Sequence, residues 1–103
     1  MTKSITNKYN LTSPIDGAGK PRKYVQYVLL LENGVSKTKK EILEDMGVDT
    51  SKIQIRGFAN KPLKIMKDRE ILSYDRSTKK WSLGNKGKEF IKTVNDSIIK
   101  FNS

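Results

Sequence analysis

The side chains that could do chemistry in this chain are its carboxylates and its many amines, because it contains no histidine and no cysteine. Those two absences remove the most common general base, the usual nitrogen and sulfur metal ligands and every thiol nucleophile. Acidic pairs such as Glu44 with Asp45 could bind magnesium in principle, but they would be carboxylate-only sites on an exposed surface. The sequence therefore predicts a protein that is not an enzyme and that holds no metal or cofactor.

Positive charge is the strongest chemical signal in the chain. Lysine and arginine number 21 against 11 acidic residues, which gives a net charge of +10. The charge is sorted along the sequence: residues 51–80 hold nine basic and three acidic residues, whereas residues 41–50 hold four acidic residues and no basic one. A basic surface attracts polyanions, nucleic acid first and anionic membrane second. The seventeen lysines outnumber the four arginines, which favours phosphate contacts over bidentate reading of bases.

The elements that position these amines begin after a polar N-terminal segment. Residues 1–20 are rich in Ser, Thr, Asn and Gly and predict a flexible arm, so the expected domain spans residues 21–103. A first helix is expected from Pro21 to Asn33, with proline in its first turn and Gly34 just past its end. Its apolar residues cover more than one stripe, which is typical of a central helix or of half a subunit interface.

A second, short helix is expected to end at Met46. Either Ser36 or Thr38 can be its N-cap, and Thr38 followed three residues later by Glu41 has the spacing of a capping box. Residues 48–57 are ambiguous: two isoleucines alternate with polar residues as in a very short strand, but a longer loop between helices fits equally well.

The third helix is expected from Asn60 to about Glu70, with Pro62 in its first turn. At about 100° per residue, Leu63 and Met66 fall on one side of this helix. Its lysines fall largely on the other side, and they are Lys61, Lys64 and Lys67.

A hairpin and a last helix complete the chain. Apolar residues alternate in segments 72–74 and 81–83, and the polar, basic stretch 75–80 between them predicts an exposed hairpin tip. Helically spaced apolar residues then predict a final helix opened by Asn85 or Gly87. The expected order is helix, helix, helix, hairpin, helix, a mainly α fold with a small β-hairpin.

Three stretches of local sequence carry a family resemblance: Glu41-Ile42-Leu43, the run from Leu63 to Leu72, and the run from Trp81 to Phe90. Together with the element order they resemble the winged helix-turn-helix family of bacterial and phage regulators over residues 22–95. In that family the wing is followed by "Leu-Thr-x-x-Gly", where this chain has Leu83-Gly84-Asn85-Lys86-Gly87, with glycine in place of threonine. Two further departures are the long stretch between the second and third helices and the position of Pro62.

The resemblance implies that the third helix lies in the major groove of DNA, with its early residues at the base edges and the hairpin wing on phosphates or in the minor groove. Asparagine can pair with adenine and lysine can reach guanine acceptors. The expected residues at the recognition helix are Arg56, Asn60, Lys61, Lys64 and Lys67. Those of the wing are Arg76, Thr78, Lys79 and Lys80, and those of the arm are Lys20, Arg22 and Lys23. Each set also has a structural reading, with Asn60 as a helix cap, the lysines as a solvated face and the wing tip as an ordinary charged turn.

The expected function is sequence-specific or semi-specific binding of double-stranded DNA by a regulator of transcription or replication that acts by occupying its site. Two alternatives stay open: a winged-helix adaptor that binds an acidic protein, and an RNA or single-strand binder. In the second, Trp81, Tyr74 and Phe58 would stack on bases, although a core role explains these rings more simply.

The apolar surplus of the first helix and of the tail, at Ile98, Ile99 and Phe101, predicts a homodimer through the first and last helices. No stretch approaches the roughly 18 apolar residues of a membrane span, and residues 1–4 lack the apolar run of a secretory signal. We therefore expect a cytoplasmic protein with no membrane partner, and no small-molecule site can be identified from the sequence.

Overall fold

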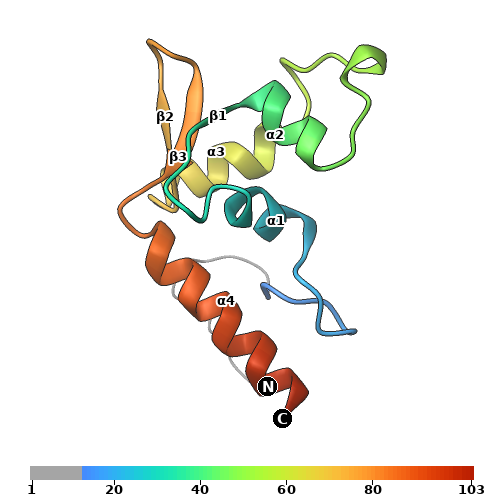
Figure 1. Ribbon diagram of the computed structural model, residues 1–103, viewed down its shortest axis with the longest axis vertical. Helices are drawn as coiled ribbons and strands as arrows, with labels where there is room; N and C mark the ends of the chain where they lie inside the picture. Colours follow the sequence, from blue (N-terminus) through green and yellow to red (C-terminus); the bar gives the residue numbers. More distant parts are fainter. Residues whose placement is uncertain (1–12) are drawn as a thin grey trace.

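The computed structural model describes residues 13–103, which form four α-helices, one short 3-10 turn and a small sheet (Figure 1). The helices are α1 (Lys23–Leu29), α2 (Lys39–Asp45), α3 (Asn60–Asp68) and α4 (Gly87–Asn102), and the 3-10 turn is η2 (Thr50–Lys52). The strands are β1 (Lys37–Thr38), β2 (Leu72–Asp75) and β3 (Lys80–Leu83). The predicted order of helices around a hairpin is confirmed, within a fold where helices dominate.

The sheet has one more strand than the sequence predicted. All its strands are antiparallel in the order β1-β3-β2, so β3 lies in the centre. Trp81 of β3 faces Tyr74 of β2 on one side and Lys37 of β1 on the other. The short β1 therefore ties the start of α2 to the hairpin, a connection that only long-range pairing could reveal.

The core lies where one face of each helix meets the start of β2. Every helix contributes at least two buried apolar side chains, and burial of each removes its apolar surface from water. The buried residues are Val25, Tyr27, Val28, Leu31, Ile42, Leu43, Leu63, Met66, Ile71, Leu72, Phe90, Ile91 and Val94.

Helix α1 is shorter than expected at both ends. Pro21 lies before the helix, because Arg22 has the extended backbone of an N-cap. At the other end the hydrogen bonds change from i→i−4 to i→i−3: Leu30 N–H donates to Gln26 O, whereas Leu31 N–H donates to Val28 O. The tighter turns carry the buried Leu31 into the core, so the apolar run continues beyond the end of the helix.

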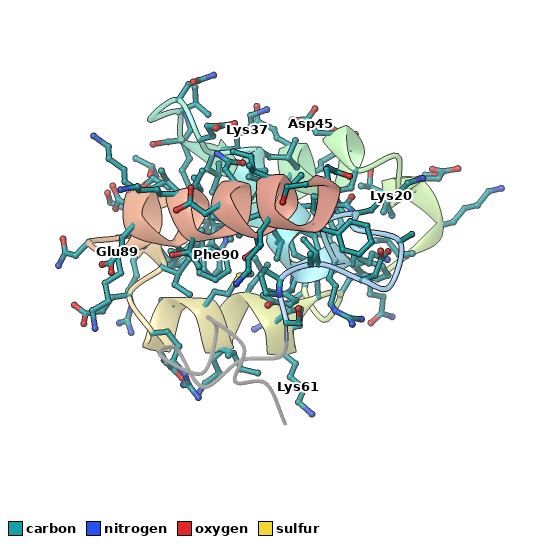
Figure 2. The ribbon with its side chains drawn as sticks, turned by 90° about the horizontal axis from the view of Figure 1, so that it is seen from below. Lys20, Lys37, Asp45, Lys61, Glu89 and Phe90 are labelled. Atoms are coloured by element: carbon teal, nitrogen blue, oxygen red, sulfur yellow. The ribbon has the colours of Figure 1, made fainter. Side chains whose placement is uncertain are left out.

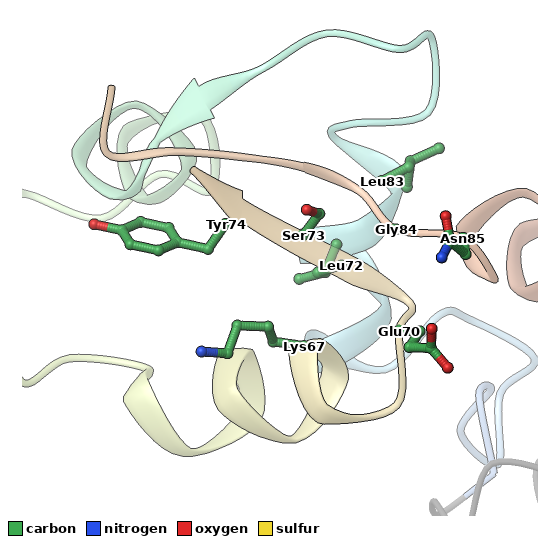
Figure 3. Close-up of a pocket in the computed structure, with 8 residues that line it drawn as sticks. All are labelled: Lys67, Glu70, Leu72, Ser73, Tyr74, Leu83, Gly84 and Asn85. Atoms are coloured by element: carbon green, nitrogen blue, oxygen red, sulfur yellow. The ribbon is translucent and has the colours of Figure 1, made fainter. Parts of the chain in front are cut away.

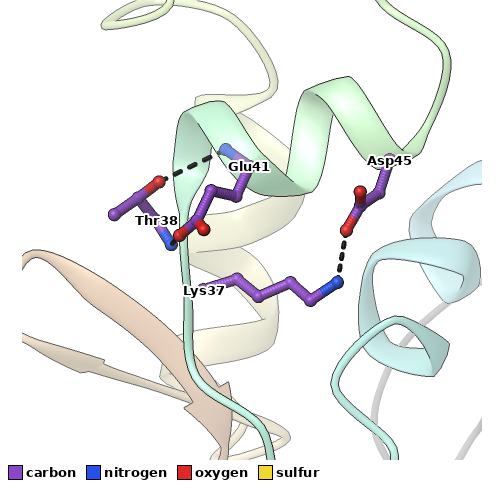
Figure 4. Close-up of polar contacts among 4 residues, drawn as sticks. All are labelled: Lys37, Thr38, Glu41 and Asp45. Atoms are coloured by element: carbon purple, nitrogen blue, oxygen red, sulfur yellow. Dashed lines mark hydrogen bonds and ion pairs between the residues drawn. The ribbon is translucent and has the colours of Figure 1, made fainter.

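Helix α2 begins as the capping box predicted. The Thr38 hydroxyl oxygen accepts from the Glu41 backbone N–H at 3.2 Å, and Glu41 Oε1 accepts from the Thr38 N–H at 2.9 Å (Figure 4). An ion pair between Lys37 and Asp45 joins the strand before the helix to its last residue. Residues 48–57 then form η2 and turns and contain no strand. The prediction of a longer loop between helices is therefore confirmed, and the prediction of a short strand is wrong.

The described part of the predicted arm, residues 13–20, forms a hydrogen-bonded loop, and residues 1–12 lie outside the described residues. Arg22 N–H donates to Pro14 O at 3.0 Å, and Asp16 Oδ1 accepts from two backbone N–H groups, of Ala18 and Lys20. These bonds, the one from Lys20 first, lower the pKa of Asp16. The loop lies against the end of α4, because a Cβ at Gly19 would overlap the ring of Phe101.

The corner after α3 brings backbone segments into close contact. Glu70 turns the chain with a left-handed φ of 62°. Gly84 N–H donates to Ile71 O and Lys86 N–H donates to Glu70 O, both at 2.9 Å. A Cβ at Gly84 would overlap the Glu70 carbonyl oxygen and lie 2.9 Å from Leu72 O. Position 84 therefore has no room for a side chain, which accounts for its glycine.

Candidate nucleic-acid interface

Helix α3 presents lysines on the face opposite the core, as the sequence predicted. Its buried residues are Leu63 and Met66, and Ile65 is half-buried between the two faces. Lys61 extends away from the body of the molecule on the side opposite α4 (Figure 2). The exposed lysines of this helix are Lys61, Lys64 and Lys67.

A carboxylate outside the predicted site residues lies on the same exposed face. Asp68 is one turn after Lys64, and its Oδ2 lies 3.3 Å from the Lys64 Nζ. Both side chains are well exposed, so the pair adds little to stability. Its effect is on the surface charge, because it partly neutralises the middle lysine of α3.

The start of α3 is held by a lysine from α2. Lys39 Nζ donates to the Asn60 side-chain oxygen and, at 3.3 Å, to the Arg56 carbonyl oxygen. Burial lowers the pKa of Lys39 from its ordinary value. Ala59, with a left-handed φ of 57°, is the N-cap, so the reading of Asn60 as a cap is wrong. The side chains of Asn60 and Arg56 are both exposed beside this contact.

One residue of the predicted arm reaches the same place. Lys23, the first residue of α1, holds its Nζ 5.8 Å from the centroid of the Phe58 ring, within the range of a cation–π contact. Arg22 beside it is exposed. Lys20 is not brought to α3: in Figure 2 it lies at the level of α4, whereas Lys61 points away beyond α3.

The hairpin tip is a cationic turn organised by one aspartate. Asp75 Oδ1 accepts from the Ser77 hydroxyl at 2.7 Å and from the Ser77 N–H at 2.9 Å, and these bonds lower the pKa of Asp75. Lys79 takes a left-handed φ of 58°, and its N–H donates to Asp75 O. The side chains that the turn leaves exposed include the whole predicted wing set, Arg76, Thr78, Lys79 and Lys80.

An open pocket of about 340 Å³ lies between α3 and the hairpin (Figure 3). Lys67 of α3 and Tyr74 of β2 extend toward the same side of it. The Tyr74 ring is packed on Trp81, with ring centroids 4.8 Å apart. At the far end of the pocket, Glu70 pairs with Lys86 at 3.7 Å. Of the three exposed lysines of α3, Lys67 lines this pocket, and the hairpin contributes residues of its strands and none of its turn.

Lys39 and Asp68 were not among the site residues predicted from the sequence, which left Lys39 as a solvated residue of the second helix. The capping box does fix Lys39 as the first residue of α2, but no local pattern links it to Asn60, which is 21 residues further along the chain. Asp68 follows Lys64 at the i,i+4 spacing of helical ion pairs, a signal that was present in the sequence.

Other kinds of site have little support in the described chain. Among residues 13–103, no three His, Cys, Asp or Glu side chains gather to hold a metal ion. None of the helices in that range is long and apolar enough to cross a membrane. Comparisons of the chain with protein-family models, curated proteins and solved structures gave no match.

Proposed function

We propose that this chain binds double-stranded DNA as a winged helix, with α3 in the major groove and the β2–β3 hairpin as the wing on the adjacent backbone. The observation that carries the proposal is a helix with three exposed lysines followed along the chain by a hairpin with a cationic turn, with Lys67 of the helix and the strands of the hairpin lining one open pocket. The sheet order β1-β3-β2, with α2 and α3 between its first two strands along the chain, supports the same fold.

The charges of this surface suit a duplex backbone. Together α3 and the hairpin turn expose six cationic side chains. Among the three on α3, Lys64 forms an ion pair with Asp68 of the same helix. Five of the six are lysines, which bind phosphates as point charges. We propose that binding regulates transcription or replication by occupying a site, with no catalytic step and no bound metal or cofactor.

The aromatic residues favour a duplex over a single strand as the target. Stacking on unpaired bases requires ring faces that are free. Trp81 and Tyr74 are half-buried against each other, and Phe58 is half-buried with Lys23 over its ring. Three rings that already have partners make a poor stacking platform.

A homodimer is a separate proposal, and its support is narrower than the sequence indicated. Val25, Tyr27 and Val28 of α1 are buried within their own chain. Ile99 of α4 is 67% exposed and is the clearest apolar surface left for a second copy. Light scattering should then give a mass above the 11.7 kDa monomer, reduced to the monomer by Ile99→Lys. A monomeric mass for the native chain at high concentration would reject the dimer.

The proposed function is tested by fluorescence anisotropy of a labelled random-sequence duplex at low and moderate salt. A footprint of six phosphates gives a log–log salt slope of about −5. We expect the double variant Lys61→Ala/Lys64→Ala to weaken binding roughly tenfold and to reduce the slope by about 1 to 2. The variant Lys79→Ala/Lys80→Ala should act in the same direction.

The matched control is Lys88→Ala/Lys92→Ala, which removes the same charge from exposed positions of α4. It should cost clearly less affinity than either interface variant. If all three variants weaken binding equally, net charge alone explains the association and the interface is misplaced. If the native chain binds no duplex at low salt despite its charge of +10, the DNA proposal fails and an acidic protein partner becomes the next candidate.

A further inference from the structure

An open groove lies between α1 and the end of α2. It encloses about 310 Å³ and is lined by Gln26, Leu29, Leu30, Asp45 and Met46. The three apolar side chains among these residues are half-buried, so each keeps part of its surface in water. Figure 2 places Asp45 and Lys61 on opposite sides of the molecule, so a partner in this α1–α2 groove would leave the lysines of α3 accessible to DNA.

The α1–α2 groove is bordered by negative charge in a chain that is otherwise strongly basic. Residues 41–50 hold four acidic residues and no basic one, whereas the whole chain has a net charge of +10. Glu44 and Asp45, at the end of α2, are both exposed. Lys37 pairs with Asp45 and offsets one of these charges. The groove therefore suits an occupant that combines apolar side chains with positive charge.

The end of α4, residues 96–102, has this combination. Ile99 is 67% exposed and Phe101 is 48% exposed. Lys100 stands between them and is exposed. Lys92 lies seven residues before Ile99, which is nearly two turns, and so falls on the same side of the helix. With Asp96 as the acid nearby, two lysines face one carboxylate and the end of α4 is net positive.

The end of α4 cannot fill the groove of its own molecule. In Figure 1 the C-terminal end of α4 lies at the opposite end of the molecule from α2. Helix α4 runs without a break from Gly87 to Asn102, so its end does not turn back toward α2. The chain thus carries two complementary surfaces that only separate copies can bring together.

We propose that the end of α4 of one copy docks in the α1–α2 groove of a second copy, with Ile99 against Leu29 and Leu30 and Lys100 near Asp45. The inference rests on the proposed self-association and does not depend on the proposed DNA binding. The contact joins two different surfaces, so each pair keeps one free groove and one free α4 end. Further copies can therefore add in the same head-to-tail way.

The test is a mixing experiment followed by sedimentation velocity at high protein concentration. Ile99→Lys removes the apolar anchor of α4, and Gln26→Lys/Asp45→Lys makes the rim of the groove positive at two exposed positions. We expect the native chain to form species above the 11.7 kDa monomer, and each variant alone to associate at least about tenfold more weakly. An equimolar mixture of the two variants should form a dimer and nothing larger, because one retains the groove and the other retains the end of α4.

The matched control is Gln54→Lys/Asp68→Lys, which makes the same change of charge at exposed positions outside the groove. It should associate as the native chain does. If it weakens association as much as the groove variant, total charge governs the contact and docking in the groove is rejected.

Cross-linking gives a second measurement that does not require a variant to disrupt the contact. The chain contains no cysteine, so a single introduced thiol is the one site of reaction. A short bis-maleimide should join Gln26→Cys to Ile99→Cys faster than it joins either variant to itself. Faster joining of Ile99→Cys to itself would indicate a two-fold contact between α4 helices and would overturn the inference.

Failure of the inference can be told apart from failure of the proposals on which it rests. If the groove variant associates like the native chain while Ile99→Lys is monomeric, the homodimer stands but does not use the groove. If the two variants remain monomeric when mixed, the end of α4 and the groove do not bind each other, and the inference is rejected. A native chain that stays monomeric rejects self-association and the inference together, and leaves the proposed DNA binding intact.

Discussion

The two ends of α3 are held in different ways. At its C-terminal end the chain turns through Glu70, and backbone groups of residues 84–86 bond directly to the corner. Ile71 and Leu72 just beyond are buried. At its N-terminal end no residue from 47 to 62 is fully buried, although Phe58 and Ala59 pack partly buried against the core. Two side-chain contacts also hold this end, Lys39 on Asn60 and Lys23 on Phe58.

The difference separates an end of α3 that is fixed by backbone packing from an end that is held by side chains. A corner built from close backbone contacts tolerates almost no change, because packed interiors cannot absorb an added atom. An end held by polar side chains can change its contacts at small cost to the fold. We infer that the C-terminal end fixes where α3 lies, whereas the N-terminal end is free to change its contacts.

The largest expected effect comes from adding a methyl group at the corner that holds the C-terminal end of α3, and the same change in the segment before α3 is the comparison. Gly84→Ala would overlap the Glu70 carbonyl, and we expect it to lower the free energy of unfolding by about 3 kcal/mol. Gly57→Ala, in the segment before α3, meets nothing within 4 Å and should change it by about 0.5 kcal/mol or less. Urea denaturation measures both. Similar losses at the two glycines would contradict the contrast between the ends.

A smaller effect is expected at the cap that sets the position of Lys39. Thr38→Ala removes the side-chain acceptor of the capping box and should cost about 1 kcal/mol of unfolding free energy. Ser36→Ala is the matched control, because the sequence allowed either residue as the cap and the structure uses only Thr38. Thermal unfolding of the two variants sharpens the comparison, and equal destabilisation would show that the cap has no special part in holding this end.

A weaker effect, on duplex affinity, is expected from changing the charge of the exposed face of α3. Asp68→Asn removes a carboxylate from the lysine face of α3 and frees Lys64 from its 3.3 Å pair, so we expect duplex affinity to rise about threefold at low salt. Asp96→Asn makes the same charge change on an exposed position of α4 and should raise affinity less. Anisotropy titrations measure both, and an equal rise would mean that the effect depends on net charge and not on the face.

The smallest effect is one that disappears in acid. Hydrogen bonds from Thr38, the backbone N–H first and then the hydroxyl, hold the pKa of Glu41 below its ordinary value of 4.5. Its stabilising contribution is therefore complete above the unfolded pKa and is lost as the pH falls through the lower folded value. Glu41→Gln should lower the melting temperature at neutral pH, and its difference from the native chain should shrink as the pH falls below 4.5. Glu32→Gln, an exposed carboxylate after α1, is the control, and an undiminished difference at low pH would contradict this account.

The parts of the fold that could be predicted from the sequence are those specified locally. The Thr38 and Glu41 spacing placed the start of α2, and the alternation around the basic stretch placed the hairpin. The exposed lysines of α3 followed from helical spacing. The contact of Lys39 with Asn60 could not be predicted, because the two residues are 21 positions apart. Strand β1 could not be predicted either, because two residues carry no periodicity. The predicted end of α1 was wrong because a run of apolar residues does not show where i→i−4 hydrogen bonding stops.

The contact between Gly19 and Phe101 has a consequence for the order in which the molecule folds. It joins positions near opposite ends of the described chain, so closing it costs the most loop entropy of any contact described for this molecule. The hairpin and α3 are neighbours along the chain and meet through short loops. We therefore expect the 13–22 loop to dock last and to open first, with its amide hydrogens exchanging faster than those of β3.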